Sequence, residues 1–255
     1  MSDILSVEVR DYVAVLQVHR PPANYFDHEL IKQLADLGAE LDESNDCRAI
    51  VLSSEGKHFC AGANFGEGPM GSDRAATSKK LYTEAVRVFQ IKTPMIAAVQ
   101  GSAVGGGLGL ACAADFRVAT PSSRLHANFA KLGFHQGFGL SVTLGDIVGQ
   151  QQAMDMLYTG RRIDGTRAFE MGLVDRLVPD GEQLTAAIAY AGEIAAAAPL
   201  AVRSIRETLR GQLAERVRAV LERELSEQSW LWDTADSKEG VTANLERRTA
   251  TFSGT

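Results

Sequence analysis

The sequence predicts an α/β fold with a helical C-terminal region, and three observations support this prediction. Short apolar segments alternate with segments of helical periodicity over most of the chain. Two of the apolar segments are followed by loops rich in small residues. From residue 181 onward the composition changes to Ala-, Glu- and Arg-rich helix. Because alternating strands and helices favour parallel strand units, we expect the loops at the strand ends to lie together.

The N-terminal part of the chain is expected to form a hairpin, a helix and a strand. Residues 5–10 and 12–18 alternate apolar and polar side chains, which predicts two paired strands. The Pro-Pro pair that follows ends the second strand, because proline cannot continue a ladder. Leucines at helical spacing predict an amphipathic helix over 28–43, and the apolar residues 49–52 predict a buried strand.

The middle of the chain continues this alternation. Residues 66–73 predict a loop that is either a lid beside a site or a plain surface connection, and a helix over about 75–92 follows. The apolar residues 95–99 predict a strand, and the small and apolar residues after the next glycines predict a buried helix. Strands are also expected at 116–119, 123–125 and 173–178, with helices ending near residue 158 and starting near residue 166.

The C-terminal part is expected to be helical throughout. Residues 200–232 predict two or three helices with an apolar stripe, a pattern more typical of a core or a subunit interface than of a cofactor site. We therefore divide the chain into a core of residues 1–195, which holds the site, and a helical C-terminal region of residues 196–255.

Size and composition exclude several classes of protein. The chain has 255 residues, 45% of them apolar, so it is long enough for a full hydrophobic core. Its net charge of -6 argues against nucleic-acid binding, which requires a basic face. No apolar run reaches the about 18 residues of a membrane span, and the N-terminus lacks the pattern of a signal peptide. We therefore expect a cytoplasmic protein without a membrane partner.

The cysteines and histidines predict neither disulfides nor a metal site. Cys47, Cys60 and Cys112 are an odd number at unrelated spacings, as expected for reduced thiols. The five histidines form no H-x-x-x-H or Cys/His cluster.

The most informative stretch is AAVQGSAVGGGLGLACAAD, residues 97–115, where clustered glycines lie between two apolar segments. A dinucleotide fingerprint G-x-G-x-x-G fails, because Leu110 or Cys112 stands where its last glycine is required. A P-loop fails because no lysine lies between Lys92 and Lys131. The free amides of a glycine turn that opens a helix suit an oxygen that develops negative charge. A turn required only for tight packing is the alternative.

A second stretch, GKHFCAGANF at residues 56–65, also follows an apolar strand and also contains small residues. Two such loops are able to direct backbone amides at one carbonyl oxygen. His58 and Cys60 alternate and could form a thiol–imidazole pair, but no third activating group is evident.

Together these two stretches resemble the crotonase (enoyl-CoA hydratase/isomerase) superfamily, whose pattern places F-C/A-A-G-A-D after one strand and A-x-x-G-x-A-x-G-G-G after the next. RPPAN near the N-terminus, TGRRIDGTRAFEMGLVDRLVP from Thr159 and SKEGVTANLERRTATFSG at the C-terminus fall where the family has related segments. The resemblance covers nearly the whole chain. It implies a spiral of ββα units and C-terminal helices that assemble a homotrimer or a hexamer of two trimers.

The resemblance also implies an enolate mechanism on an acyl-CoA thioester. The family's two oxyanion-hole donors fall on the backbone amides of Ala63 and Gly106. The two catalytic carboxylates of the hydratases fall on Gly109 and Phe129, so both are missing. We therefore do not expect the usual two-glutamate addition of water.

Another residue must then act as acid or base. His135 is the first candidate, because histidine titrates near neutrality and this one lies in a glycine-flanked loop near the position of an aspartate in some family members. Its alternative role is a hydrogen bond within its own loop. Glu67 and Asp73 are weaker candidates, and His126 is expected to end a strand.

Coenzyme A, as part of the substrate, is the only cofactor-like group that the resemblance implies, and none is expected to be bound covalently. Its adenine is expected near residues 61–64, including Ala61 and Asn64, and Lys57 or Arg20 near its phosphates. Phe252, with Arg247 or Arg248, matches a C-terminal segment that reaches the adenine of a neighbouring subunit in the family. A solvated surface charge is the alternative for each basic residue.

The function expected from this resemblance is that of an atypical enoyl-CoA hydratase/isomerase family enzyme. Isomerisation, hydrolysis, carbon–carbon cleavage and atypical hydration remain open as its reaction. The alternatives are a non-catalytic acyl-CoA binding protein and a structural trimer. Phe129, Phe134 and Phe138 indicate an apolar or aromatic acyl pocket.

Overall fold

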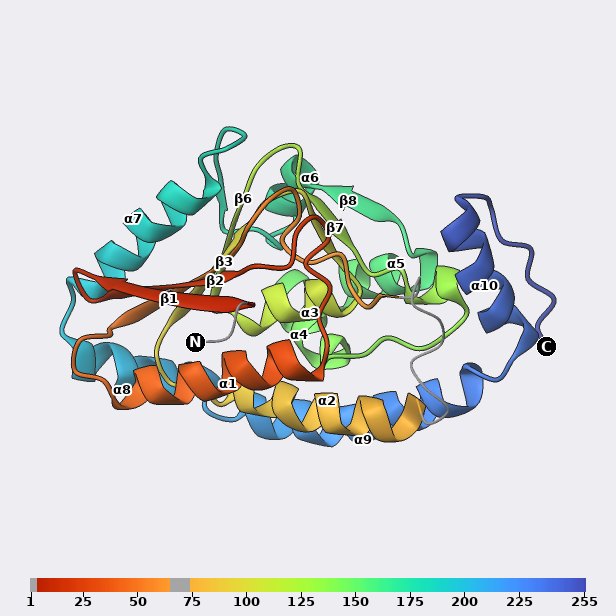
Figure 1. Ribbon diagram of the computed structural model, residues 1–255, viewed down its shortest axis with the longest axis horizontal. Coiled ribbons are helices and arrows are strands. Elements are labelled where there is room, and N and C mark those ends of the chain that lie inside the picture. Colours follow the sequence, from red (N-terminus) through yellow and green to blue (C-terminus); the bar gives the residue numbers. More distant parts are fainter. Residues whose placement is uncertain (1–3, 65–73) are drawn as a thin grey trace.

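The computed structural model describes residues 4–64 and 74–255, and its described part contains a larger and a smaller sheet (Figure 1). The larger sheet has the strand order β1-β2-β3-β4-β6-β9. Its first pair is antiparallel and the other pairs are parallel. Its strands are β1 (Leu5–Arg10), β2 (Val13–Val18), β3 (Ala49–Ser54), β4 (Met95–Val99), β6 (Phe116–Ala119) and β9 (Arg176–Leu177). The predicted hairpin and parallel strand units are thus confirmed.

The smaller sheet consists of β5 (Ser102–Val104), β7 (Arg124–His126) and β8 (Arg162–Asp164), in that order. Strands β5 and β8 were not expected from the sequence, because three residues are too few to show an alternating pattern. His126 ends β7, as predicted. Strand β9 is shorter than the predicted strand over 173–178.

Ten α-helices surround these sheets in the described residues. They are α1 (His28–Glu43), α2 (Arg74–Phe89), α3 (Gly106–Ala113), α4 (Leu140–Val148), α5 (Gln150–Thr159), α6 (Gly165–Glu170), α7 (Gln183–Ala195), α8 (Pro199–Arg210), α9 (Leu213–Leu231) and α10 (Ala235–Glu246). A short 3-10 helix, η2 (Phe129–Leu132), precedes α4. Helix α1 has the predicted bounds, and its N-cap Asp27 accepts a hydrogen bond of 2.9 Å from the Leu30 amide.

The helices form layers on the two faces of the larger sheet. Helix α7 covers one face, where Ala187, Ala191 and Ala195 pack on apolar strand residues. Helices α1, α2 and α9 run side by side on the other side, with α3 between them and the strands (Figure 1). All residues of α3 are buried. The glycine-rich turn therefore leads into the centre of the fold.

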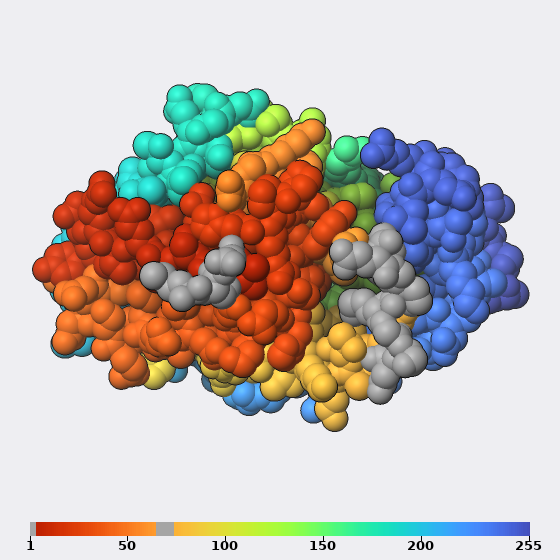
Figure 2. Space-filling view, in the orientation of Figure 1, coloured from red at the N-terminus to blue at the C-terminus, as the bar shows by residue number. Residues whose placement is uncertain are grey.

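The C-terminal region has one buried and one exposed part. Val217 and Leu221 of α9 belong to the main core. Helix α8 has no buried residue, and its Leu200, Ile205 and Leu209 are mostly exposed. The predicted apolar stripe is therefore divided between a core surface and an exposed surface. Figure 2 shows the last residues of the chain, in the darkest blue, gathered at one end of the molecule, whereas α8 lies at the other end (Figure 1).

Partly buried ion pairs connect α8 to the sheet. Asp115 lies 3.0 Å from both Arg206 Nε and Arg210 Nη1, and it accepts a hydrogen bond of 2.8 Å from the Met95 amide. This structural role for Asp115 agrees with the sequence analysis.

The loop expected at 66–73, with Glu67 and Asp73, lies outside the described residues. No single helix in the rest of the chain is long and apolar enough to cross a membrane, and the pair Gln183–Ala195 and Pro199–Leu231 passes that test only when its two parts, bent by 104°, are joined.

Candidate active site

Two loops meet beside strand β5. The first loop follows β3 and contains Cys60, and the second is the glycine-rich turn between β5 and α3. The Cys60 amide donates to the Ser102 carbonyl at 2.9 Å, and the Val104 amide donates to the Cys60 carbonyl at 2.9 Å. The loop after β3 is therefore extended alongside the segment that leads into the glycine-rich turn. This confirms the expectation that the two loops converge.

Asn24, in the RPPAN segment, holds the first loop from behind. Its fully buried side chain donates from Nδ2 to the carbonyls of Glu55 and His58, at 2.8 and 2.6 Å. Farther along, the Phe26 amide donates to the Gly62 carbonyl at 3.1 Å. The first loop thus has hydrogen-bonded neighbours on both sides, and its amides are fixed in place.

Two glycines of the turn are required by close contacts. A Cβ atom on Gly106 would lie 2.3 Å from Phe26 Cζ, and one on Gly107 would lie 2.3 Å from the Cys60 carbonyl oxygen. Gly105, the N-cap of α3, has φ 55° and ψ -120°, a conformation available to glycine. A side chain at position 106 would displace the Phe26 ring, and one at position 107 would displace the backbone of the first loop.

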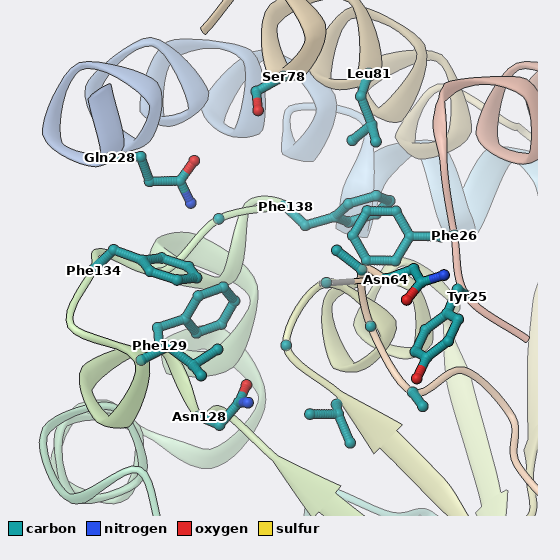
Figure 3. A pocket seen from close by; sticks show the side chains of 18 of the residues that line it. Tyr25, Phe26, Asn64, Ser78, Leu81, Asn128, Phe129, Phe134, Phe138 and Gln228 are labelled. Carbon is teal, nitrogen blue, oxygen red and sulfur yellow. The ribbon is translucent and has the colours of Figure 1, made fainter. Parts of the chain in front are cut away.

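A pocket with a volume of about 390 Å³ lies above this turn (Figure 3). Aromatic rings form much of its wall. Phe129 and Phe134 meet edge to face with 6.1 Å between their centroids, and Phe134 packs in the same way on Trp232. On another side Phe26 meets Phe138 at 5.8 Å. Phe129, Phe134 and Phe138 all line the pocket, so its predicted aromatic character is confirmed.

The backbone amides of Ala63 and Gly106 both belong to residues that line this pocket. Gly106 is the first residue of α3, so its N–H has no helical partner. Within residues 4–64 and 74–255, neither of the two N–H groups donates a hydrogen bond to another group of the chain. Two free donors, from two different strand-end loops, are thus available to a group in the pocket.

The position of the first missing carboxylate is filled by an aromatic ring. A Cβ atom on Gly109 would lie 2.7 Å from Phe138 Cβ and 3.0 Å from its Cδ1. Phe138 itself is 1% exposed and has φ 59°, the left-handed region that non-glycine residues rarely adopt. The fold therefore has no room for a carboxylate side chain at position 109.

No carboxylate lines the pocket in the part of the chain that the structure describes. The position of the second missing carboxylate is Phe129, which is buried in the aromatic wall. Burial raises the pKa of the Tyr82 phenol and lowers the pKa of His126, whose Nε2 lies 2.7 Å from the Gly160 carbonyl oxygen. Neutral groups therefore dominate the described lining.

His135 is half-buried but is not among the residues that line the pocket. Its Nδ1 lies 2.9 Å from the Gln136 carbonyl oxygen, and its own carbonyl accepts a hydrogen bond of 3.0 Å from Gln228. The structure thus brings Ala63 and Gly106 together but places the His135 ring within its own loop. Its acid–base role stays a prediction.

The residues expected near coenzyme A are only partly brought together. Ala61 and Asn64 line the pocket beside the two free amides, whereas Lys57 is exposed outside the pocket lining. Phe252, in the C-terminal segment, is 44% exposed and is not among the lining residues. Arg20 is paired with Asp27 at 2.7 Å.

Arg247 and Arg248 end helix α10. Arg248 forms ion pairs with Glu239 at 2.5 Å and with Glu246 at 2.6 Å. The amide of Thr251 donates to the same Glu239 at 2.9 Å. These contacts fold the C-terminal segment back along α10.

Helices α2 and α9 contribute pocket residues that sequence reasoning missed. The Tyr82 hydroxyl donates to Gln228 Oε1 at 2.8 Å, and Ser78 lies one helical turn before Tyr82 on the pocket side (Figure 3). Trp232 follows Gln228 at the end of α9. Single polar residues on otherwise ordinary helices carry no motif, so no signal in the sequence was able to identify them.

Behind the pocket, a buried glutamate holds the loop that carries Phe138. Glu224 of α9 is fully buried and accepts hydrogen bonds from the amides of Gly139 at 2.9 Å and Ser141 at 3.0 Å. These are free amides at the start of α4, where a carboxylate is favourable. Burial nevertheless raises the pKa of Glu224.

The interpretation of His58 and Cys60 as a nucleophilic pair receives no support. Burial raises the pKa of the Cys60 thiol to about 11, so the thiolate is scarce at neutral pH. His58 Nδ1 has no hydrogen-bond partner among the residues that the structure describes.

Comparison with known proteins gives consistent matches over the full chain. A sequence model of the enoyl-CoA hydratase/isomerase family matches residues 8–255. The (E)-benzylidenesuccinyl-CoA hydratase of Thauera aromatica is 33% identical, over 98% of this chain and 99% of that protein. A probable enoyl-CoA hydratase of Bacillus subtilis is 30% identical, over 98% of each chain.

Solved structures are similar as well. The enoyl-CoA hydratase/isomerase of Pseudoalteromonas atlantica superposes with a TM-score of 0.86 at 28% identity, covering 98% of this chain and 100% of that one. An enoyl-CoA hydratase/isomerase of Mycobacterium paratuberculosis superposes with a TM-score of 0.83 at 28% identity, covering 95% and 98% of the two chains.

Proposed function

Because the chain belongs to the enoyl-CoA hydratase/isomerase family, we propose that it acts on the thioester of an acyl-CoA through an enolate. The backbone amides of Ala63 and Gly106 bind the thioester oxygen and stabilise its charge as the α-proton leaves. Each such donor in a dry site contributes on the order of 10²–10³ in rate.

The observation that carries this proposal is the pair of free amides in the pocket. A buried N–H group without an acceptor is costly, so such groups are rare unless water or a ligand satisfies them. Here the buried Gly106 and the half-buried Ala63 each bring such an amide to one pocket, and close contacts at Gly106 and Gly107 keep side chains away from the turn. A carbonyl oxygen fits this arrangement, because it accepts two hydrogen bonds.

The reaction differs from two-glutamate hydration. Phe138 fills the space beside Gly109, and Phe129 belongs to the aromatic wall, so neither position supplies a carboxylate. Proton transfer then depends on another group, for which His135 remains the predicted residue. Isomerisation, hydrolysis and carbon–carbon cleavage all begin from a polarised thioester and are the reactions to be tested.

We assign the coenzyme A part of the substrate to the side of the pocket formed by Ala61 and Asn64, with Lys57 at the exposed end of the same loop. In this proposal the chain assembles into a homotrimer or a hexamer through its C-terminal region. The exposed Leu200, Ile205 and Leu209 of α8 support this assembly, because a surface of that kind is typical of an interface. Phe252 then contacts the adenine bound to a neighbouring subunit.

A non-catalytic acyl-CoA binding protein is the second candidate. It is favoured by one observation, the lack of a carboxylate among the described residues that line the pocket. Such a protein would keep the two amide donors and the aromatic wall but would not remove the α-proton.

One experiment separates the candidates. The purified protein is incubated in D₂O with a panel of saturated and unsaturated acyl-CoAs, and mass spectrometry measures α-deuteration and products. Deuterium uptake above the protein-free rate supports the enolate mechanism. Binding by calorimetry without uptake supports the non-catalytic binder. Failure to bind any acyl-CoA refutes both and favours a structural trimer.

A further inference from the structure

Asn128 presents a carboxamide to the pocket that the rest of the chain does not use. The residue is 8% exposed and lines the pocket (Figure 3). Its side chain forms no hydrogen bond with any group in residues 4–64 and 74–255. Its polar atoms are not sealed in the interior but open onto the pocket, so their hydrogen bonds are made to water or to a ligand there.

The backbone of Asn128 already performs the structural task expected at this position. Its carbonyl accepts from the Lys131 and Leu132 amides, at 3.0 and 3.2 Å, and so starts the short helix η2. The side chain does not cap that helix, although asparagine commonly does so. The fold therefore does not explain why this side chain is polar.

The carboxamide lies close to the proposed oxyanion hole. Asn128 Oδ1 is 3.3 Å from the point where a Cβ atom on Gly105 would lie, and Gly105 directly precedes the free amide of Gly106. In Figure 3 the side chain lies beside Phe129 and on the opposite side of the pocket from Asn64. If the coenzyme A part lies along Asn64, Asn128 faces the acyl part.

We infer that the Asn128 carboxamide is a specificity-determining group that hydrogen-bonds a neutral oxygen on C3 of the acyl chain, as in 3-hydroxyacyl- or 3-oxoacyl-CoA. This inference rests on the proposed function. The thioester oxygen is taken by the amides of Ala63 and Gly106, so the nearest oxygen left for Asn128 is a substituent farther along the chain. A carboxamide both donates and accepts, so it suits a hydroxyl and an oxo group alike.

The test compares matched ligands on matched variants. Butyryl-CoA, 3-hydroxybutyryl-CoA and 3-oxobutyryl-CoA are titrated by calorimetry into wild-type protein, Asn128→Leu and Asn128→Ala. Leucine keeps the size of the side chain and removes its hydrogen bonds, and alanine serves if leucine disturbs η2. Asn45→Ala, at an exposed turn, controls for loss of an amide elsewhere. Where a ligand is turned over, kcat/KM replaces Kd in the comparison.

We expect wild-type protein and Asn45→Ala to bind the C3-oxygenated ligands about 3- to 10-fold more tightly than butyryl-CoA, the range of one neutral hydrogen bond. In Asn128→Leu and Asn128→Ala this ratio falls to about 1, with butyryl-CoA affinity within a few-fold of wild type. An unchanged ratio, or equal weakening of all three ligands, overturns the inference and leaves the proposed function intact. If no ligand binds the wild-type protein, it is the proposed function that fails.

Discussion

Gly109→Ala tests whether Phe138 really fills the space where a hydratase carboxylate would lie. The added Cβ meets Phe138 Cβ at 2.7 Å, a distance that real Cβ atoms essentially never show. Phe138 is unable to move easily, since the next amide, that of Gly139, is bonded to the buried Glu224. One of the two backbones must therefore shift.

The expected effect combines two opposing terms. Overpacking of a buried site costs about 1–3 kcal/mol. Replacing a helix-interior glycine by alanine gains about 0.5–1 kcal/mol. The free energy of unfolding of Gly109→Ala should therefore fall by up to about 2.5 kcal/mol, which lowers Tm by up to about 10 °C for a chain of this size.

Gly145→Ala is the matched control. Gly145 also lies inside a helix, α4, but an added Cβ meets nothing within 4 Å. The same substitution should here raise the free energy of unfolding by about 0.5–1 kcal/mol. Urea denaturation of both variants measures the difference. If Gly109→Ala is as stable as Gly145→Ala, Phe138 does not exclude a side chain from position 109, and our explanation of the missing carboxylate is wrong.

Three further predictions concern the site and its support. Gly107→Ala, whose Cβ would lie 2.3 Å from the Cys60 carbonyl oxygen, should push apart the two loops that carry the Ala63 and Gly106 amides and reduce α-deuteration by on the order of 10²-fold or more, and an unchanged exchange rate in D₂O would refute the role of this amide pair. His135→Ala should abolish turnover while acyl-CoA affinity by calorimetry stays within a few-fold, whereas unchanged turnover would remove His135 as the acid–base residue. Because burial raises the pKa of Glu224, the folded protein keeps this proton to higher pH than the unfolded chain does, so stability falls as pH rises from the ordinary glutamate pKa of about 4.3 through the raised value. Glu224→Gln does not titrate, so in denaturation experiments the stability of the wild-type protein should fall relative to that of Glu224→Gln as pH rises above about 4.3, and an equal pH dependence of the two proteins would contradict this explanation.

Most of the fold was accessible from the sequence because its signals are local. The helix over 28–43 and the strands over 95–99 and 116–119 have the predicted bounds, since hydrophobic period and caps depend on near neighbours in the chain. The crotonase-like fold is confirmed by the family match and the structural neighbours. The short strands β5 and β8 were missed, because their partners, and not their own residues, make them strands.

The candidate site likewise has some residues that the sequence predicted and others that it did not. Motif positions gave Ala63 and Gly106, because backbone amides depend on the local course of the chain, and glycine and alanine are visible in the sequence. The absence of carboxylates at Gly109 and Phe129 was equally visible.

Only the tertiary structure decided which side chains fill the space beside Gly109 and enclose the pocket. Phe138 fills the volume beside Gly109, and Trp232 and Gln228 close the pocket from a helix about a hundred residues away in sequence. The free carboxamide of Asn128 was likewise invisible, since whether a polar side chain has a partner depends on every element packed around it. Such properties arise from the packing of distant segments, for which a single sequence carries no local signal.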